Sequence, residues 1–188
     1  LKEGGPRHVV PLLADAVNRI ETLYRTRDPI TGLATGYHDL DRMTAGLQNS
    51  DLVIVASRPS MGKTSLALNF AEHAIMQEGE GTVLFFSLEQ PAEQLILRML
   101  SSLGHIDQTR MRTGELSDED WPRFTSAVSQ LKDRALFIDD TPALSPNDIR
   151  TRARRVSREA GGLKMIVVDY MQLMKSSEKH ENRASEIS

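Results

Sequence analysis

The sequence predicts a mixed α/β domain with a mostly parallel sheet flanked by helices. Two observations lead to this fold class. Short apolar runs rich in β-branched residues, typical of buried strands, recur along the chain. They alternate with longer segments whose apolar residues fall at helical spacing. Because each helix can carry the chain across the sheet to the next strand, we expect right-handed crossovers between parallel strands.

Four apolar runs are the predicted strands. They are residues 52–57 (LVIVAS), 82–88 (TVLFFSL), 135–140 (ALFIDD) and 164–170 (KMIVVDY). After residue 174 the chain becomes polar. An intact doubly wound domain rarely ends just after a strand, so we expect further strands of this domain to be missing from the chain.

Four helices are predicted between these strands. They cover residues 64–76, a segment that begins at Pro91, residues 117–131 and residues 146–160. Pro91 suits the first turn of a helix, where its missing N–H does no harm. Ser117 with Asp120, and Ser145 with Asp148, match the pattern of a capping box at a helix start. Gly161 and the glycine after it end the last helix.

The first 30 residues are predicted to form a linker helix and a connector, ahead of the domain at 31–188. Apolar residues recur at helical spacing over residues 9–28, namely Val9, Leu13, Val17, Ile20 and Tyr24. Pro29 and Gly32 end this helix. Its spacing shows a face for burial but not the partner, which can be its own domain or a neighbouring subunit.

The composition limits the class of protein. Apolar residues make up 39% of the 188 residues and charged residues 26%, as in globular proteins. No apolar run approaches the roughly 20 residues of a membrane span, and the first residues do not resemble a signal peptide. There are no cysteines and the histidines lack metal-site spacing, which fits a cytoplasmic protein without a zinc site. Because the chain starts with Leu, we expect it to be part of a longer protein.

The segment from Ala56 to Phe70, ASRPSMGKTSLALNF, predicts a phosphate-binding loop. Gly62, Lys63 and Thr64 match the end of the G-x-x-x-x-G-K-[ST] pattern, although Ser57 stands where the first glycine belongs. In such a loop the lysine reaches the β- and γ-phosphates, and the hydroxyl reaches Mg²⁺. The other interpretation is a tight turn with an exposed lysine. The candidate nucleotide-binding residues are Ser57, Arg58, Pro59, Ser60, Met61, Gly62, Lys63, Thr64 and Ser65.

Three carboxylates at strand ends are candidates for a catalytic site. Asp139 and Asp169 each end an apolar run, and either can support Mg²⁺. We favour Asp169, because Asp139 leads into a turn that gives it a structural role. Glu89 ends the second strand, at the sheet edge where ligands of α/β proteins bind. It can accept a proton from an attacking water, or it can be an ordinary surface residue.

Five blocks in order make the chain resemble the C-terminal motor domain of bacterial replicative DNA helicases of the DnaB type. The resemblance runs from about residue 31 to 188. Its blocks are TGLATGYHDLDRMTAGLQNSDLVIV, RPSMGKTSLALN, FFSLEQPAEQLILRMLS, LFIDDTPALSPNDIRTRARR and IVVDYMQLM, followed by ENRASEIS. The sequence departs from the family pattern at Ser57 and at Ser50, where the family usually has small residues such as glycine.

The resemblance implies a RecA-like core in a hexameric ring that hydrolyses ATP and translocates on single-stranded DNA. Lys63 would hold the phosphates, Thr64 and Asp169 the Mg²⁺, and Glu89 would activate water. The helix at 9–28 would dock on the adjacent subunit. Primase and a helicase loader would be partners. A RecA-like recombinase, or an oligomerisation module that senses nucleotide without turnover, is the alternative.

The family places its DNA-contacting loops and its arginine finger around or beyond the end of this chain. We therefore expect the isolated fragment to bind nucleotide but to hydrolyse it poorly. The polar segment 175–183 is the first candidate for a DNA contact. Arg150, Arg154 and Arg158, spaced by four on one helix, can follow DNA phosphates, or form a solvated face or a subunit contact.

Overall fold

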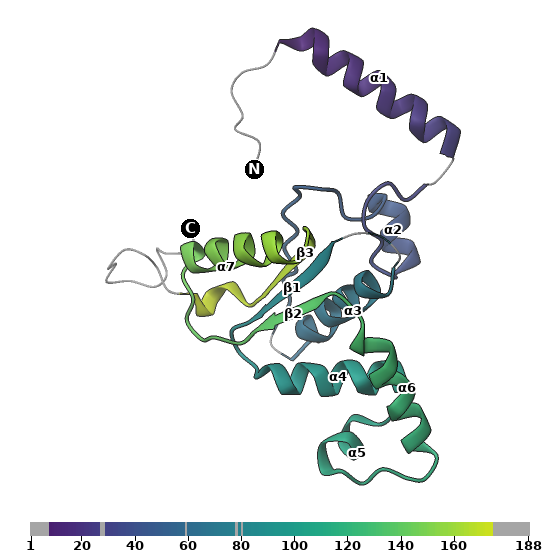
Figure 1. Cartoon of the computed structure of the whole chain (residues 1–188), viewed down its shortest axis with the longest axis vertical. Helices are drawn as coiled ribbons and strands as arrows, with labels where there is room; N and C mark the ends of the chain where they lie inside the picture. The colour runs from purple at the N-terminus through teal and green to yellow at the C-terminus, as the bar shows by residue number, and fades with distance from the viewer. Residues whose placement is uncertain (1–7, 27–28, 59, 78, 80, 175–188) are drawn as a thin grey trace. The chain divides into compact units, whose positions relative to one another are not determined.

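The computed structural model describes residues 8–26, 29–58, 60–77, 79 and 81–174. The chain divides into two compact units, residues 1–51 and residues 52–188. Each unit has its own secondary structure (Figure 1). The sheet and the predicted site belong to the second unit. The predicted domain boundary near residue 30 remains a prediction.

The second unit is built on a parallel three-stranded sheet in the order β2-β1-β3. The strands are β1 (Thr82–Ser87), β2 (Leu136–Asp139) and β3 (Leu163–Asp169). The central strand pairs with both neighbours, and Ser87 lies opposite Asp169 in the register. The carboxyl ends of β1 and β3 therefore lie side by side, as the rule for ligand sites in α/β sheets requires.

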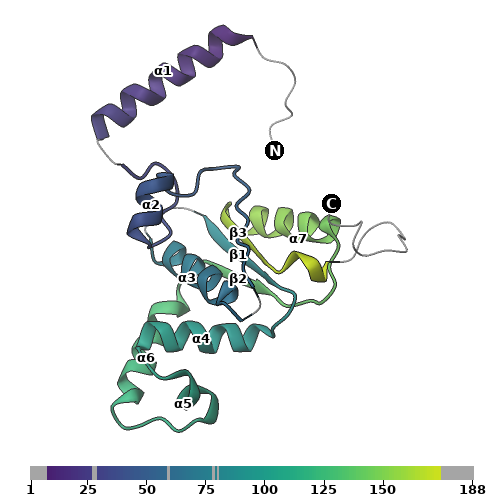
Figure 2. The ribbon, with the colours of Figure 1, turned by 180° about the vertical axis from the view of Figure 1, so that it is seen from behind.

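Helices cover both faces of this sheet. Along β1, Leu84 and Phe86 belong to a core cluster with Ala153 and Val156 of α7 (Pro146–Glu159). Because side chains alternate along a strand, Val83 and Phe85 point to the opposite face. Helix α3 (Lys63–Met76) packs against β1 and β3. Figures 1 and 2 show α3 and α7 on opposite sides of the strands. The predicted α/β fold is confirmed.

Three helices form the crossover from β1 to β2. They are α4 (Ala92–Gly104), α5 (Gln108–Thr113) and α6 (Asp120–Lys132). A second apolar cluster holds them together, with Leu100, Ile106, Met111 and Ala127 at its centre. Figure 1 shows this group below the sheet in that view. The sequence analysis did not predict α5, which is only 6 residues long.

The described residues of the first unit form two helices, α1 (Val9–Thr26) and α2 (His38–Thr44). Helix α1 confirms the predicted N-terminal helix, whereas the short α2 was not predicted. The carboxylate of the buried Asp41 accepts hydrogen bonds from the Thr35 amide and hydroxyl, at 2.8 and 2.7 Å. Gly32 lies against a neighbouring backbone, because a Cβ there would come within 2.4 Å of the Leu47 carbonyl oxygen.

The predicted strand at 52–57 is wrong. Residues 51–58 form neither strand nor helix, and the apolar side chains from Leu52 to Val55 are 41–82% exposed. An apolar β-branched run becomes a strand only where a neighbour takes up its backbone hydrogen bonds. Within the described residues, the sheet pairs only β1, β2 and β3 with one another, so this segment has no such neighbour.

The other predicted elements lie close to their predicted bounds, with one late helix start. Helix α6 begins at Asp120, not at Ser117, because the Asp120 carboxylate bonds back to the Ser117 amide and hydroxyl and closes a turn ahead of the helix. The capping box of Ser145 and Asp148 is confirmed, with both reciprocal hydrogen bonds formed. No helix of the described residues has the length and apolar character of a membrane span.

Candidate active site

The predicted phosphate loop leads into the N-terminus of α3. Gly62 precedes the helix with φ of 85°, a left-handed conformation that a glycine adopts without strain. No side chain caps this end of α3. The first amides of a 14-residue helix therefore point outward beside Lys63 and Thr64, which are both half-buried. Such an uncapped helix end favours an anion.

The strongest contact in the site joins α3 to the end of β3. The Thr64 hydroxyl donates a hydrogen bond of 2.7 Å to the Asp169 carboxylate, across 105 positions of sequence. Asp169 is only 6% exposed, so its carboxylate is held in place by its surroundings. The fold thus brings together the two residues that the sequence analysis assigned to Mg²⁺.

A further residue of the site, Tyr170, was missed by the sequence analysis. The Lys63 ammonium nitrogen lies 5.0 Å from the centre of the Tyr170 ring, within the range of a cation–π interaction. Tyr170 directly follows Asp169, so the end of β3 contacts both Lys63 and Thr64. The position of an aromatic residue next to the carboxylate was the only signal available in the sequence.

Glu89 lies on the same edge of the sheet as Asp169. Glu89 stands two residues after Ser87, the last residue of β1. The amide of the intervening Leu88 donates a 2.7 Å hydrogen bond to the Asp169 carbonyl. The Glu89 side chain is exposed. This position leaves its carboxylate accessible to a ligand at the edge formed by β1 and β3.

The described residues in the first half of the phosphate loop are exposed and have no regular secondary structure. Ser57 and Arg58 lie in the irregular exposed segment, and the Ser57 hydroxyl donates to the Arg58 carbonyl at 3.2 Å. Ser60 has a positive φ of 62°, and the Met61 amide bonds back to the Arg58 carbonyl. Ser60, Met61 and Ser65 are exposed, and Pro59 lies outside the described residues. Within the described residues, no hydrogen bond joins this part of the loop to Asp169 or Glu89.

Asp139 has a structural role, as the sequence analysis favoured. Its carboxylate binds the Arg152 guanidinium at 2.6 and 2.9 Å and also accepts from the Thr141 amide. Burial acts to raise the pKa of this carboxyl, but the hydrogen bonds from Arg152 and Thr141 outweigh burial and hold the pKa below its ordinary value. The ion pair joins the end of β2 to α7 and occupies the carboxylate.

The chemistry of the site fits a magnesium nucleotide better than a metal held by protein alone. Among the described residues, no three His, Cys, Asp or Glu side chains gather closely enough to hold a metal ion. Mg²⁺ in phosphate-transfer sites usually has one or two protein oxygens, with phosphate and water completing its coordination. The paired oxygens of Thr64 and Asp169 beside an open helix N-terminus match that requirement.

The proposed DNA contacts are only partly described. Residues 175–183 lie outside the described residues. Arg150, Arg154 and Arg158 are exposed on α7, and Arg150 donates to Asn147 at 2.7 Å. Arg152, by contrast, belongs to the ion pair with Asp139. The structure therefore presents an exposed basic stripe on α7.

The fold and the site have the features of the phosphate-loop class of nucleotide-binding domains. Comparison with protein families gives the more specific assignment: the model of the DnaB-like helicase C-terminal domain matches residues 32–188. The chain therefore belongs to the DnaB-like helicase C-terminal domain family, which confirms the resemblance seen in the sequence.

Individual relatives agree with this assignment. The chain is 48% identical over 188 residues to the replicative DNA helicase DnaB of Buchnera aphidicola subsp. Acyrthosiphon pisum, with 99% of this chain and 41% of the relative covered. It is 50% identical over 187 residues to that of Haemophilus influenzae, with 97% of this chain and 40% of the relative covered. The chain thus spans about two fifths of the length of these relatives.

Solved structures show the same fold. One solved ATPase domain superposes with a TM-score of 0.88 at 27% identity, over 97% of this chain and 64% of that chain. A DnaB-like replicative helicase, studied with its interactions with primase, gives a TM-score of 0.82 at 27% identity, over 98% of this chain and 43% of that one. The RecA-like fold expected from the sequence is confirmed by these neighbours.

Proposed function

We propose that this chain is the motor domain of an ATP-dependent replicative DNA helicase, which couples ATP hydrolysis to translocation on single-stranded DNA and to duplex unwinding. The observation that carries the proposal is the 2.7 Å hydrogen bond between Thr64 and Asp169, in a chain of the DnaB-like family. This contact places a hydroxyl and a carboxylate together beside the N-terminus of α3, as a magnesium nucleotide site needs.

Each residue of the site has a proposed role. Lys63 binds the β- and γ-phosphates, and the amides of residues 57–65 surround them. Thr64 and Asp169 hold Mg²⁺, which when bound supplies positive charge to neutralise the phosphates. Lys63 would leave the Tyr170 ring to reach the nucleotide, since a cation–π contact at a half-exposed site is worth only about 0.5–1 kcal/mol.

Glu89 is the proposed general base. It lies at the carboxyl end of β1, beside the end of β3, and its carboxylate is exposed to a ligand at this edge. A carboxylate there can accept the proton of the attacking water while Lys63 stabilises the charge on the phosphates. The location of Glu89 supports the role, although hydrogen bonds do not fix its side chain within the described residues.

Helix α1 is the proposed contact between subunits of a homohexamer. Its apolar stripe is exposed, with Leu13, Val17, Ile20 and Tyr24 at 56–79%. A helix of 18 residues with such a stripe gains little stability by itself and normally buries the stripe against a partner. The hexamer, with α1 docked on the adjacent subunit, therefore rests on the exposed stripe and on the family assignment.

Further partners follow from the same proposal. One solved neighbour is a DnaB-like helicase that interacts with primase, and this supports primase as a partner. Single-stranded DNA is the proposed nucleic acid along which the ring translocates. A helicase loader is the proposed partner that assembles the ring on this DNA. We propose that the protein acts in the cytoplasm.

The test is Mg²⁺-dependent ATP hydrolysis by the full-length protein, with and without single-stranded DNA. We expect DNA to stimulate hydrolysis. Lys63→Ala should weaken nucleotide affinity by about tenfold or more, because it removes a charged phosphate contact. Glu89→Gln should keep that affinity but slow hydrolysis by about 100-fold or more, as the loss of a general base does. Sedimentation of the same preparations measures assembly.

Three outcomes would contradict parts of the proposal. Nucleotide binding without any turnover would favour an oligomerisation module that senses nucleotide. Hydrolysis and DNA binding without strand separation would favour a recombinase-type ATPase. Equal hydrolysis by the Glu89→Gln variant would remove Glu89 from the role of base. Glu93→Gln on α4 is the matched control, because it makes the same change on an exposed carboxylate of the next helix.

A further inference from the structure

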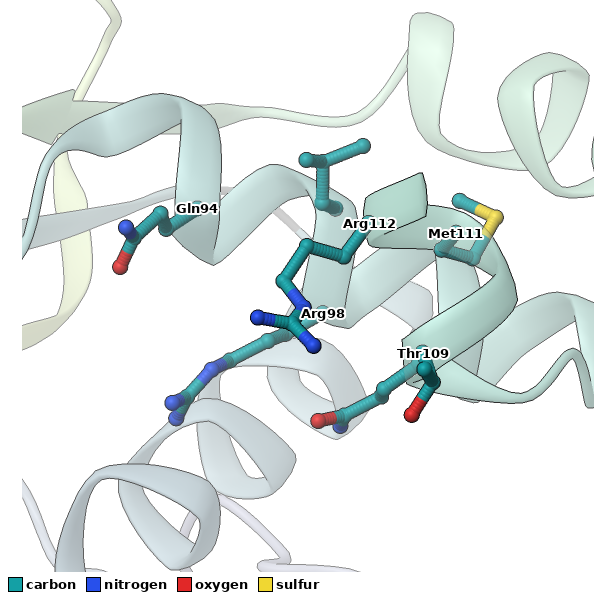
Figure 3. Close-up of a pocket in the computed structure, with 7 residues that line it drawn as sticks. Gln94, Arg98, Thr109, Met111 and Arg112 are labelled. Carbon is teal, nitrogen blue, oxygen red and sulfur yellow. The ribbon is translucent and has the colours of Figure 1, made fainter. Parts of the chain in front are cut away.

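A pocket lies between α4 and α5, in the three-helix crossover (Figure 3). Its volume is about 290 Å³, close to the lower end of the range for small-molecule sites. The lining residues are Gln94, Leu97, Arg98, Gln108, Thr109, Met111 and Arg112. None of them is acidic, so the walls of the pocket carry two positive charges and no negative one.

Two guanidinium groups reach this pocket from different helices. Arg98 is a half-buried residue of α4, and Arg112 is an exposed residue of α5. In Figure 3 both side chains extend toward the same side of the pocket. Within the described part of the chain, neither guanidinium forms an ion pair or a hydrogen bond.

Two other arginines of the same unit are paired with carboxylates. Arg110, on α5, forms an ion pair of 3.1 Å with Asp120, and Arg152 binds Asp139 at 2.6 Å. Arg98 and Arg112 instead line the same pocket, which has no acidic lining residue. Two guanidinium groups without carboxylate partners at one pocket favour an anion there, because the anion accepts their hydrogen bonds and offsets their charge.

The pocket is held on a packed base. Met111 is 9% exposed and belongs to the apolar cluster of α4, α5 and α6, against which Leu97 also packs. The Asp107 carboxylate accepts hydrogen bonds from the Thr109 and Arg110 amides, at 2.8 and 3.1 Å, and thereby fixes the start of α5. These amides are therefore occupied, and the donors left for a ligand are side chains.

We propose that this pocket binds a small molecule through an oxyanion of the phosphate class. The Arg98 and Arg112 guanidinium groups would bind two of its oxygens, since a guanidinium matches phosphate geometry. The amides of Gln94 and Gln108 and the Thr109 hydroxyl would donate to the remaining oxygens. The apolar floor of Leu97 and Met111 would contact the organic part of the ligand. The pocket shares no lining residue with the phosphate loop, so this proposal does not depend on nucleotide binding there.

The test is a titration of the whole 188-residue chain with inorganic phosphate and with pyrophosphate, followed residue by residue by backbone amide NMR. The Thr109 and Arg112 amide signals should shift with a saturable response, separately from those of Gly62 to Thr64. Arg98→Gln and Arg112→Gln should each weaken binding at the pocket by about tenfold, since each removes one charged contact. Arg123→Gln, an exposed arginine of α6 outside the pocket, is the charge-matched control and should leave the affinity unchanged.

Each other result would overturn the proposal. If Arg123→Gln weakens the shifts at Thr109 and Arg112 as much as Arg98→Gln does, the anion responds to the overall charge of the chain and not to a site. No saturable shift with either anion would remove the site. A response to hexaglutamate alone, lost in Arg98→Gln, would show that the two arginines receive an acidic protein segment and not a small phosphate. Unchanged spectra of the apolar cluster in both variants would verify that they remain folded.

Discussion

Two apolar runs of similar composition in the second unit differ in structure and in burial. The central strand β1, with the sequence TVLFFS, is buried at every position. The segment LVIV at residues 52–55 is 41–82% exposed and forms no strand. Both runs are rich in residues that favour strands. They differ in what surrounds them, since β1 has a hydrogen-bonded strand on each side and a helix on each face.

This difference shows that residues with high strand propensity form a strand only where neighbouring strands accept and donate the backbone hydrogen bonds. The backbone groups of β1 find partners in β2 and β3, so burial of Leu84, Phe85 and Phe86 leaves its amides satisfied. The exposed segment leads directly into the phosphate loop. The loop therefore has a firm attachment on the side of α3 and an unsupported one on the side of Val55.

The largest expected effect comes from shortening one side chain in each run. Leu84→Ala should lower the free energy of unfolding by about 2–5 kcal/mol, because it leaves a cavity beneath α7. Ile54→Ala should change it by no more than about 0.5 kcal/mol, because Ile54 is 67% exposed. Urea unfolding of the 188-residue chain measures both. A loss at Ile54 comparable to that at Leu84 would show that the segment is packed in solution.

A smaller effect is expected where β2, one of the two outer strands, is joined to α7. Arg152→Gln should destabilise the fold by about 1–2 kcal/mol at pH 7, a value reduced for solvent screening because both side chains are partly exposed. The half-buried Asp139 would then lose its ion partner. Arg154→Gln on the same helix is the matched control and should have little effect, because Arg154 is exposed.

The effect of Arg152→Gln should depend on pH in one direction. The pKa of Asp139 is lowered in the folded chain, so the pair stabilises the fold above the unfolded carboxyl pKa of about 3.9. This contribution is lost as the pH falls through the lower pKa of the folded state. The stability of the parent and of the variant should therefore converge in strong acid. A constant difference down to about pH 2 would contradict the assignment of the pair.

The smallest expected effect is at the junction between the exposed segment and α3. Gly62→Ala should destabilise the chain by about 0.5–1 kcal/mol, because an alanine is strained at φ of 85° and only part of that strain is offset by reduced freedom in the unfolded chain. A Cβ at Gly62 would meet no atom within 4 Å, so steric clash adds nothing. Gly62→Asn should cost less, since asparagine tolerates this conformation. An asparagine variant less stable than the alanine one would point to a different cause.

The fold was predictable where local signals are strong. The capping box at Ser145 and the stop at Gly161 were predicted correctly because each depends on neighbours in sequence. The short helices α2 and α5 were missed, since 6 or 7 residues give too little periodicity to recognise. The strand at 52–57 was wrong because its outcome depends on partners far along the chain.

The candidate site was also predictable only where the signals are local in the sequence. Motif spacing indicated Lys63 and Thr64, the end of an apolar run indicated Asp169, and the fold placed Thr64 against Asp169. The contact of Lys63 with Tyr170 could not be predicted, because it arises from the parallel register of β1 and β3 and the packing of α3 on them. The roles of these residues, and that of Glu89, remain proposals for the experiments above.

The sequence by itself indicated the α/β class, the family and the candidate phosphate-binding residues, because periodicity, capping and motif spacing are local properties of the chain. The tertiary structure alone decided which apolar run became the central strand, that Asp139 pairs with Arg152, and that Arg98 and Arg112 line one pocket. These outcomes depend on contacts between residues distant in sequence. Burial and hydrogen bonding acquire their free energy only once such residues are brought together.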